Sequence, residues 1–111
     1  MRYHVHEDEV HATAGNGLTY KSLITEQFGA VNGFVLGMTE YYAEEYQNVG
    51  LHETQEGFYV IAGEGTARIG DEEFPIRPGA SFIAPKGVPH SVKKSPGSFP
   101  VKLIWAHAAV E

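Results

Sequence analysis

The sequence predicts an all-β fold, and two observations support that prediction. Short apolar runs of strand length recur along the chain, and each ends at a turn signal rich in glycine, proline or acidic residues. These turn signals recur roughly every 8 to 10 residues, which is typical of a β-sandwich or a closed β-barrel. No stretch combines the length and the capping residues of a convincing helix.

Residues 1–16 are predicted to form a polar arm that precedes the barrel. His4, His6 and His11 fall in this arm and could suggest a metal site. Alternation places His4 and His6 on one face of an extended segment, and no apolar strand and glycine turn follow His11. We therefore interpret the cluster as a solvated face, or as a face of an arm that packs on a partner subunit.

Residues 17–111 are predicted to form one barrel domain. The segment 18–25 is rich in β-branched and aromatic residues. In segment 33–43 both alternating sets of side chains are largely apolar, which predicts burial on both faces, by a second sheet or a second subunit. The full set of predicted strands is 18–25, 33–43, 58–62, 66–69, 73–76, 81–84, 90–94 and 99–107.

The turns between the later strands contain most of the glycines that we interpret structurally. Gly63, Gly65, Gly79 and Gly87 are predicted to adopt positive φ, which glycine does at no steric cost. We assign these glycines no chemical role.

Composition excludes several classes of function. The formal net charge of -6 disfavours nucleic acid and anionic membrane surfaces, because both require a basic surface. The chain has no cysteine, so disulfides and thiolate metal sites are excluded. We see no signal peptide and no run long enough to span a bilayer, and we expect a cytoplasmic protein.

Three candidate metal ligands flank the run of short predicted strands between residues 58 and 84. His52 and Glu56 precede the run of short strands, and His90 follows the proline-rich turn at its end. Two imidazoles and one carboxylate held by rigid strands could bind a divalent transition metal. The alternative is structural: His52 and Glu56 could simply pair with each other, and His90 could be a neutral core histidine.

These residues fall in two motifs, and through them the chain resembles the cupins, small jelly-roll β-barrels. The first motif of that family is His, any residue, His, three or four residues, Glu, six residues, Gly. His52, Glu56 and Gly63 match its last three positions. The second motif is Gly, five residues, Pro, any residue, Gly, two residues, His, three residues, Asn, and the matching residues are Gly79, Pro85, Gly87 and His90.

The chain departs from the family pattern at two positions. Gly50 stands where the family has its first histidine, and Lys94 stands where it has asparagine. The resemblance implies a jelly-roll barrel of two antiparallel sheets with little helix, and a homodimer. It also implies a metal held by His52, Glu56 and His90, although metal-binding cupins typically use the first histidine as well.

The resemblance implies a function in small-molecule chemistry. We expect a divalent transition metal (Fe, Mn, Zn or Ni) and an enzyme of oxygenase, lyase or isomerase type that acts on a small polar molecule inside the barrel. Tyr41, His107 and Glu40 are candidates for a catalytic acid or base. His107 is also the best candidate for an additional ligand, with Tyr41 or Tyr42 as weaker ones. The alternatives are a non-enzymatic module that binds a sugar-like ligand, and a degenerate cupin without metal.

Overall fold

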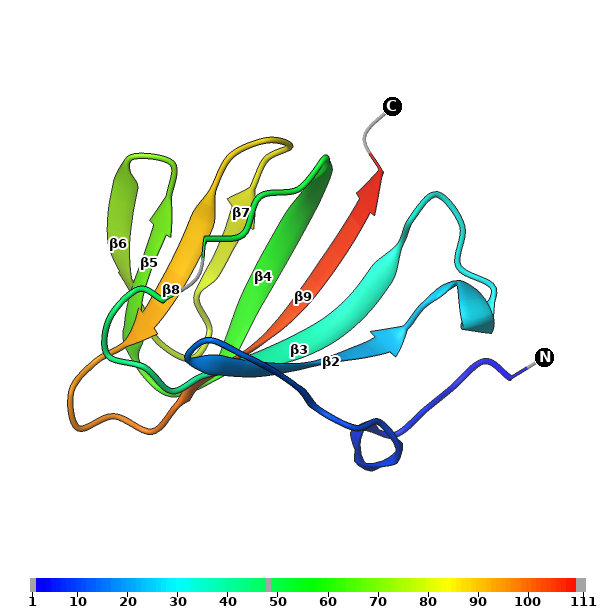
Figure 1. The fold of residues 1–111 in the computed structure, drawn as a ribbon, viewed down its shortest axis with the longest axis horizontal. Coiled ribbons are helices and arrows are strands. Elements are labelled where there is room, and N and C mark those ends of the chain that lie inside the picture. The colour runs from blue at the N-terminus through cyan, green and yellow to red at the C-terminus, as the bar shows by residue number, and fades with distance from the viewer. Residues whose placement is uncertain (1, 48, 110–111) are drawn as a thin grey trace.

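The structure, a computed structural model, describes residues 2–47 and 49–109, so the outer ends of the predicted arm and barrel, Met1 and Glu111, lie outside it. It confirms the all-β prediction. Two antiparallel sheets face each other, and the described residues include only two short 3-10 helices, η1 (Glu7–Glu9) and η2 (Glu26–Phe28) (Figure 1). Neither has the length that crossing a membrane requires.

The larger sheet has six strands and the smaller sheet has three. The order in the larger sheet is β1-β2-β3-β9-β4-β7, and the order in the smaller sheet is β6-β5-β8. Every pair of neighbouring strands is antiparallel. The strands are β1 (Thr13–Gly15), β2 (Leu18–Ile24), β3 (Val35–Tyr41), β4 (Thr54–Ala62), β5 (Gly65–Ile69), β6 (Glu72–Ile76), β7 (Ser81–Ala84), β8 (His90–Lys94) and β9 (Val101–Ala109).

The core lies between the two sheets and follows from strand alternation. Along β9, Val101, Leu103 and Trp105 are buried, whereas Ile104 between them is exposed. The apolar residues buried between the sheets are Phe58, Val60, Ala67, Ile76, Ala84, Val92, Val101, Leu103 and Trp105. Each fully buried valine or leucine contributes about 1.5–3 kcal/mol to folding.

Most predicted strands differ from the structure at one or both ends, and the differences in two of them affect the site. β4 begins at Thr54 instead of residue 58, and β9 runs from Val101 to Ala109 instead of from 99 to 107. The cause is pairing, since Thr54 lies opposite Ala109 and Glu56 lies opposite His107. The extension places Glu56 inside a regular strand, beside the last inward-facing residues of β9.

The prediction for the turn glycines holds at three positions and is wrong at one. Gly63, Gly79 and Gly87 have φ of 80°, 96° and 75°. Gly65 does not have a positive φ; instead, a side chain there would overlap the carbonyl oxygen of Lys93 on the neighbouring strand β8. The glycine is therefore required by close approach of two backbones.

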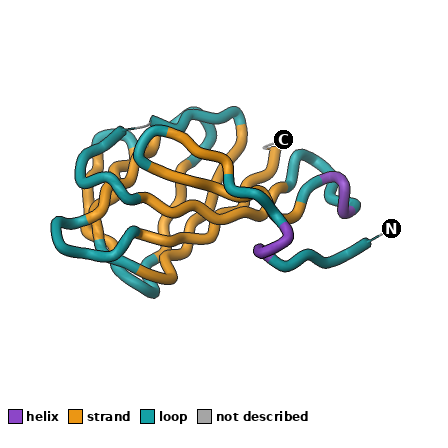
Figure 2. The backbone as a smooth tube through the Cα atoms, turned by 60° about the horizontal axis from the view of Figure 1, so that its bottom comes forward, coloured by secondary structure: helices purple, strands orange, loops and turns teal. Residues whose placement is uncertain are grey.

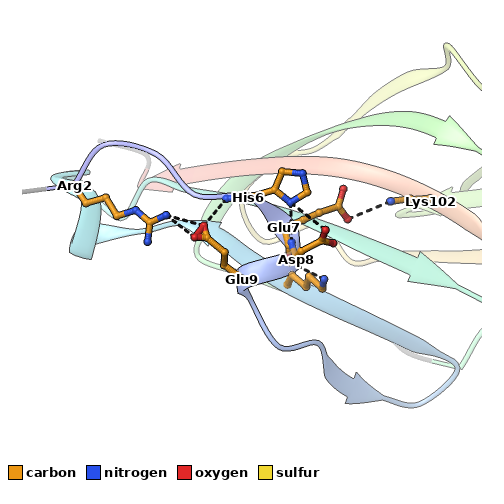
Figure 3. A network of polar contacts seen from close by, with 7 residues as sticks. Arg2, His6, Glu7, Asp8, Glu9 and Lys102 are labelled. Carbon is orange, nitrogen blue, oxygen red and sulfur yellow. Dashed lines mark hydrogen bonds and ion pairs between the residues drawn. The ribbon is translucent and has the colours of Figure 1, made fainter.

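The N-terminal arm around Glu7 lies against the outer face of its own sheet (Figure 3), whereas Thr13–Gly15 join that sheet as strand β1. The Lys102 ammonium lies 3.4 Å from the Glu7 carboxylate, and Lys21 donates to the Glu7 carbonyl at 2.8 Å. Met38, on the same outer face of β3, is buried. Figure 2 shows both short helices (purple) at the end of the molecule that carries the N-terminus. Packing of this arm on a partner subunit stays a prediction.

Candidate metal centre and cavity

A cavity of about 440 Å³ opens between the sheets at one end of the barrel. His52, Glu56, His90 and His107 line it from the end of the barrel where β4 and β8 begin and β9 finishes, whereas Tyr41 pairs with Val101 at the start of β9. The end where β9 finishes is at the top of Figure 1. The volume is in the range of cavities that bind small organic ligands. The cavity is lined by Gly15, Leu18, Tyr20, Ser22, Thr39, Tyr41, Val49, Gly50, His52, Glu56, His90, Trp105 and His107.

Three side chains converge on one point of this cavity. Glu56 comes from β4, His90 is the first residue of β8, and His52 lies in the loop before β4. The Oε1 atom of Glu56 lies 3.4 Å from Nε2 of His52 and 3.6 Å from Nε2 of His90. One ligand atom of each residue lies within 4.8 Å of the others, so the three could hold a single metal ion.

Backbone hydrogen bonds fix the loops that carry the two histidines. Gly50 and His90 exchange hydrogen bonds of 2.8 and 2.9 Å, which joins the loop before β4 to the start of β8. Gly87 donates to the His52 carbonyl at 2.9 Å, so the turn that precedes β8 also contacts the loop. The spacing of the second motif therefore brings His90 back to His52 through a short, anchored turn.

Burial sets the protonation of Glu56 and His90. Only 6% of Glu56 is exposed, and burial raises the pKa of its carboxyl to about 7. Burial, with a smaller repulsion from His52, lowers the pKa of His90 to about 4, so its imidazole is neutral at physiological pH. A carboxylate that is costly to ionise therefore faces a neutral imidazole, and a bound cation would stabilise its charged form.

The donor set fits a divalent transition metal. The buried Glu56 Oε1 has no hydrogen-bond partner, although it faces two imidazole nitrogens. Two imidazole nitrogens and one carboxylate oxygen suit Fe, Mn, Zn or Ni, and such a set leaves coordination positions open for substrate or water. An ion in this place would provide the partner that the buried oxygen lacks.

His107 forms the wall of the cavity beside the three ligands. Its ring stacks on His52 at 5.7 Å and on Trp105 at 5.3 Å, and its buried Nδ1 has no hydrogen-bond partner. Burial, with a smaller effect of His52, lowers the pKa of His107. His107 thus lines the cavity, but its ring lies outside the three-residue cluster.

The other candidates for acid–base chemistry fall in different places. Tyr41 lines the cavity, and burial, reinforced by the nearby Glu56 carboxylate, raises the pKa of its hydroxyl well above the usual range. Glu40 lies on the opposite face of β3 with Met38, and Tyr42 is exposed; neither lines the cavity. Strand alternation explains the difference between Tyr41 and Glu40.

The sequence analysis assigned no site role to the residues of the hairpin formed by β1 and β2. Gly15, Leu18, Tyr20 and Ser22 all line the cavity. The signal was present in the strand 18–25, since its alternate residues 18, 20 and 22 share one face. What the sequence did not reveal was that this strand pairs with β3 and so borders the cavity.

The N-terminal histidines take no part in the candidate metal centre. Among residues 2–47 and 49–109, the one group of three ligand-type side chains within coordinating distance is His52, Glu56 and His90. His6 instead caps η1, with its Nδ1 accepting from the Asp8 backbone at 3.1 Å. This agrees with the interpretation of His4, His6 and His11 as a surface cluster.

Comparison with known proteins gives the chain a family. A family model described as the cupin domain matches residues 40–107, more than half of the chain, whereas no curated protein matches. Among solved structures, the polyketide cyclase RemF from Streptomyces resistomycificus is 26% identical with a TM-score of 0.75, over 100% of this chain and 87% of that one.

Two further structures show the same fold at lower identity. The Schizosaccharomyces pombe Cnp3 cupin domain has a TM-score of 0.71 and 23% identity, over 84% of this chain and 61% of that one. The Fe(II) form of HppE has a TM-score of 0.79 and 21% identity, over 94% of this chain and 59% of that one. This chain spans less than two thirds of both relatives. With the family model, the two facing sheets and the matching motifs, these findings show that the chain belongs to the cupin family.

Proposed function

We propose that this cupin is a metal-dependent enzyme that acts on a small polar molecule bound in the barrel cavity. The observation that supports the proposal best is the convergence of His52, Glu56 and His90 around one buried carboxylate oxygen that has no hydrogen-bond partner. The proposed metal is Fe, Mn, Zn or Ni, and the proposed reaction class is oxygenase, lyase or isomerase. The description of one similar structure as an Fe(II) protein is consistent with iron.

When bound, a metal of this kind polarises a substrate oxygen or ionises a bound water, and iron also supports redox chemistry. Glu56 would supply the negative charge, and His90 binds without first losing a proton, because burial lowers its pKa to about 4. His52, Glu56 and His90 all line the cavity, so a substrate would reach them from the cavity side.

Two further cavity residues differ in whether their side chain can accept a proton or donate a hydrogen bond. His107 has a lowered pKa, so it is neutral at physiological pH and could accept a proton. Tyr41 has a pKa raised by burial, so it keeps its proton and could donate a hydrogen bond. We propose His107 as a general base and Tyr41 as a hydrogen-bond donor to the bound substrate.

The apolar residues that line the cavity would contact the rest of the substrate. Trp105 donates its indole N–H to the Thr39 hydroxyl at 2.8 Å, so its polar atom is already satisfied and its ring presents apolar surface. Leu18 and Tyr20 add to this surface. A polar head at the metal and a less polar body against this surface would suit the cavity best.

Elemental analysis of the purified, untagged protein tests the proposal. After loading with Fe(II), Mn, Zn or Ni, we expect close to one metal per chain in the wild type and loss of that metal in His52→Ala and in His90→Ala. His11→Ala is the matched control, because His11 is exposed and belongs to the surface cluster. Absence of metal from the wild type after every loading would refute the proposal and favour a metal-free binding module.

We also propose that the chain forms a homodimer through the outer face of the larger sheet. Four large apolar side chains are exposed on the neighbouring strands of this face, which is typical of an interaction surface. They are Tyr59, Ile61, Ile83 and Ile104. Light scattering coupled to size-exclusion chromatography measures the mass directly, and a monomer at micromolar concentration would contradict the proposal.

A further inference from the structure

The cavity that contains the candidate ligands has no Lys or Arg side chain in its lining. All 8 Lys and Arg residues of the chain fall within the described ranges 2–47 and 49–109, and none of them lines the cavity. Among the described lining residues, Glu56 is the one acid. The other polar side chains of the lining are imidazoles and hydroxyls, and hydroxyls are neutral at physiological pH. A negatively charged group on the body of a ligand would therefore meet no cationic side chain in the cavity.

Strand direction and polar contacts hold the cations elsewhere. Along β5 and β8 the buried Ala67 and Val92 belong to the core, so Arg68 and Lys93 beside them point to the outer face of the smaller sheet. Both lie over the Tyr46 ring there, at 4.6 and 4.8 Å from its centroid. Arg77 is exposed in the turn before β7. The other five have acceptors of their own, which are Glu9 for Arg2, Glu7 for Lys21 and Lys102, Glu53 for Lys86, and Glu44 for Lys94.

The candidate metal centre would supply a single excess positive charge. A divalent ion bound by the Glu56 carboxylate and by the neutral imidazoles of His52 and His90 keeps one net positive charge. One anionic donor group on the ligand would cancel it, and this is favourable because a net charge away from water is costly. A second anionic group would have neither the ion nor a cationic side chain to pair with.

From this distribution of charge we infer that the cavity selects a ligand with a single anionic donor group, such as a carboxylate, an enolate or a phenolate, and an uncharged body. Dicarboxylates and molecules with a separate phosphate group are excluded. The anionic donor group rests on the proposed metal-dependent function, whereas the uncharged body follows from the lining alone. This body would lie among Tyr20, Ser22, Tyr41 and Trp105.

Calorimetric titration of the Zn(II)-loaded protein with terephthalate and with its monoamide tests the inference. The two ligands have nearly the same shape and share one carboxylate, but the monoamide has a neutral amide where terephthalate has its second carboxylate. We expect terephthalate to bind at least about tenfold more weakly, because its second charge loses water without gaining a partner. Equal or tighter binding of terephthalate, or no binding of the monoamide at millimolar concentration, would overturn the inference.

A cation introduced into the lining should change this preference. Ser22 lines the cavity and is exposed, so Ser22→Lys adds an ammonium that can stay in contact with water. We expect Ser22→Lys to bind terephthalate severalfold more tightly than the wild type does, through a partly solvated ion pair. Ser22→Gln is the matched control, because it adds a polar side chain without charge and should keep the wild-type preference. An unchanged preference in Ser22→Lys would contradict the inference.

Lys86 provides a control at the neighbouring turn. It precedes β8, and 51% of its side chain is exposed although it pairs with Glu53 at 3.6 Å. Because Lys86 does not line the cavity, Lys86→Gln should leave the preference between the two ligands unchanged. Weaker binding of terephthalate alone in this variant would show that Lys86 serves the cavity as a cation, which would refute the inference.

Titration of the metal-free protein separates the inference from the proposed function. Trp105 is the single tryptophan and lines the cavity, so its fluorescence follows binding there. Without metal we expect benzamide to bind more tightly than benzoate, because the lining offers the carboxylate no cation. Equal or tighter binding of benzoate refutes the inference. A wild type that prefers benzamide but binds no metal refutes the proposed function and supports the requirement for an uncharged body.

Discussion

The clearest prediction concerns the protons that are released when metal binds. Burial raises the pKa of Glu56 to about 7 from an ordinary value of 4.5. At pH 6 the carboxyl is then roughly 90% protonated, and at pH 8 roughly 10%. Because a metal binds only the carboxylate, binding at pH 6 must displace about 0.9 proton from Glu56, and binding at pH 8 about 0.1.

The protonation of Glu56 also determines how the metal affinity changes with pH. Protonation competes with the metal, so the apparent affinity should fall by about tenfold between pH 8 and pH 6 through Glu56 alone. An unperturbed glutamate would contribute almost nothing in this interval. His90 contributes nothing either, because a pKa of about 4 leaves it neutral throughout the range.

Isothermal titration in buffers of different ionisation enthalpy counts the protons directly. Glu56→Gln is the control, because it keeps both imidazoles but has no ionisable group at position 56. The difference in proton release between the two proteins therefore comes from the carboxyl. We expect the wild type to release nearly one more proton than the variant at pH 6 and nearly the same number at pH 8. Equal proton release at pH 6 would refute the conclusion that burial holds this carboxyl protonated.

Three further tests, two of them with a control substitution, address the core and the wall of the cavity. Leu103→Ala should lower the free energy of unfolding by about 2–5 kcal/mol in urea titrations, because Leu103 is fully buried between the sheets, whereas exposed Ile104→Ala should cost far less. Thr39→Val leaves the buried Trp105 N–H without its acceptor and should cost about 1–3 kcal/mol, but Thr39→Ser should be nearly neutral. The fluorescence of the single tryptophan follows both, and equal stability of the two Thr39 variants would count against this hydrogen bond. His107→Phe keeps a ring beside Trp105 but removes its nitrogens, and we expect the Co(II) absorption spectrum to stay unchanged; a changed spectrum would identify His107 as a fourth ligand.

Much of the fold follows from local signals in the sequence. The strands between Phe58 and Lys94 are short apolar runs separated by glycine and proline turns, so both their number and most of their bounds could be predicted. The start of β4 could not, because Gln55 and Gly57 are poor strand formers on their own. Pairing with β9 supplies the missing stabilisation, and such pairing is not visible in local sequence.

The candidate site could likewise be predicted only in part from the sequence. The resemblance carried by the two motifs implied that His52, Glu56 and His90 would meet, and the structure brings them together. The pairing of Gly50 with His90 could not be predicted, because it depends on which segment lies opposite. The contribution of Leu18 and Tyr20 to the cavity likewise depends on the pairing of β2 with β3.

The positions of Glu56 and His90 have a mechanical consequence. Glu56 belongs to β4 of the larger sheet, and His90 begins β8 of the smaller sheet. A metal ion bound by both would therefore cross-link the two layers at the open end of the barrel. The chain has no cysteine, so it cannot form the disulfide that ties many small domains together. Removal of the ion would release this end first, and amide hydrogen exchange near the starts of β4 and β8 would quicken while the core around Leu103 stayed protected.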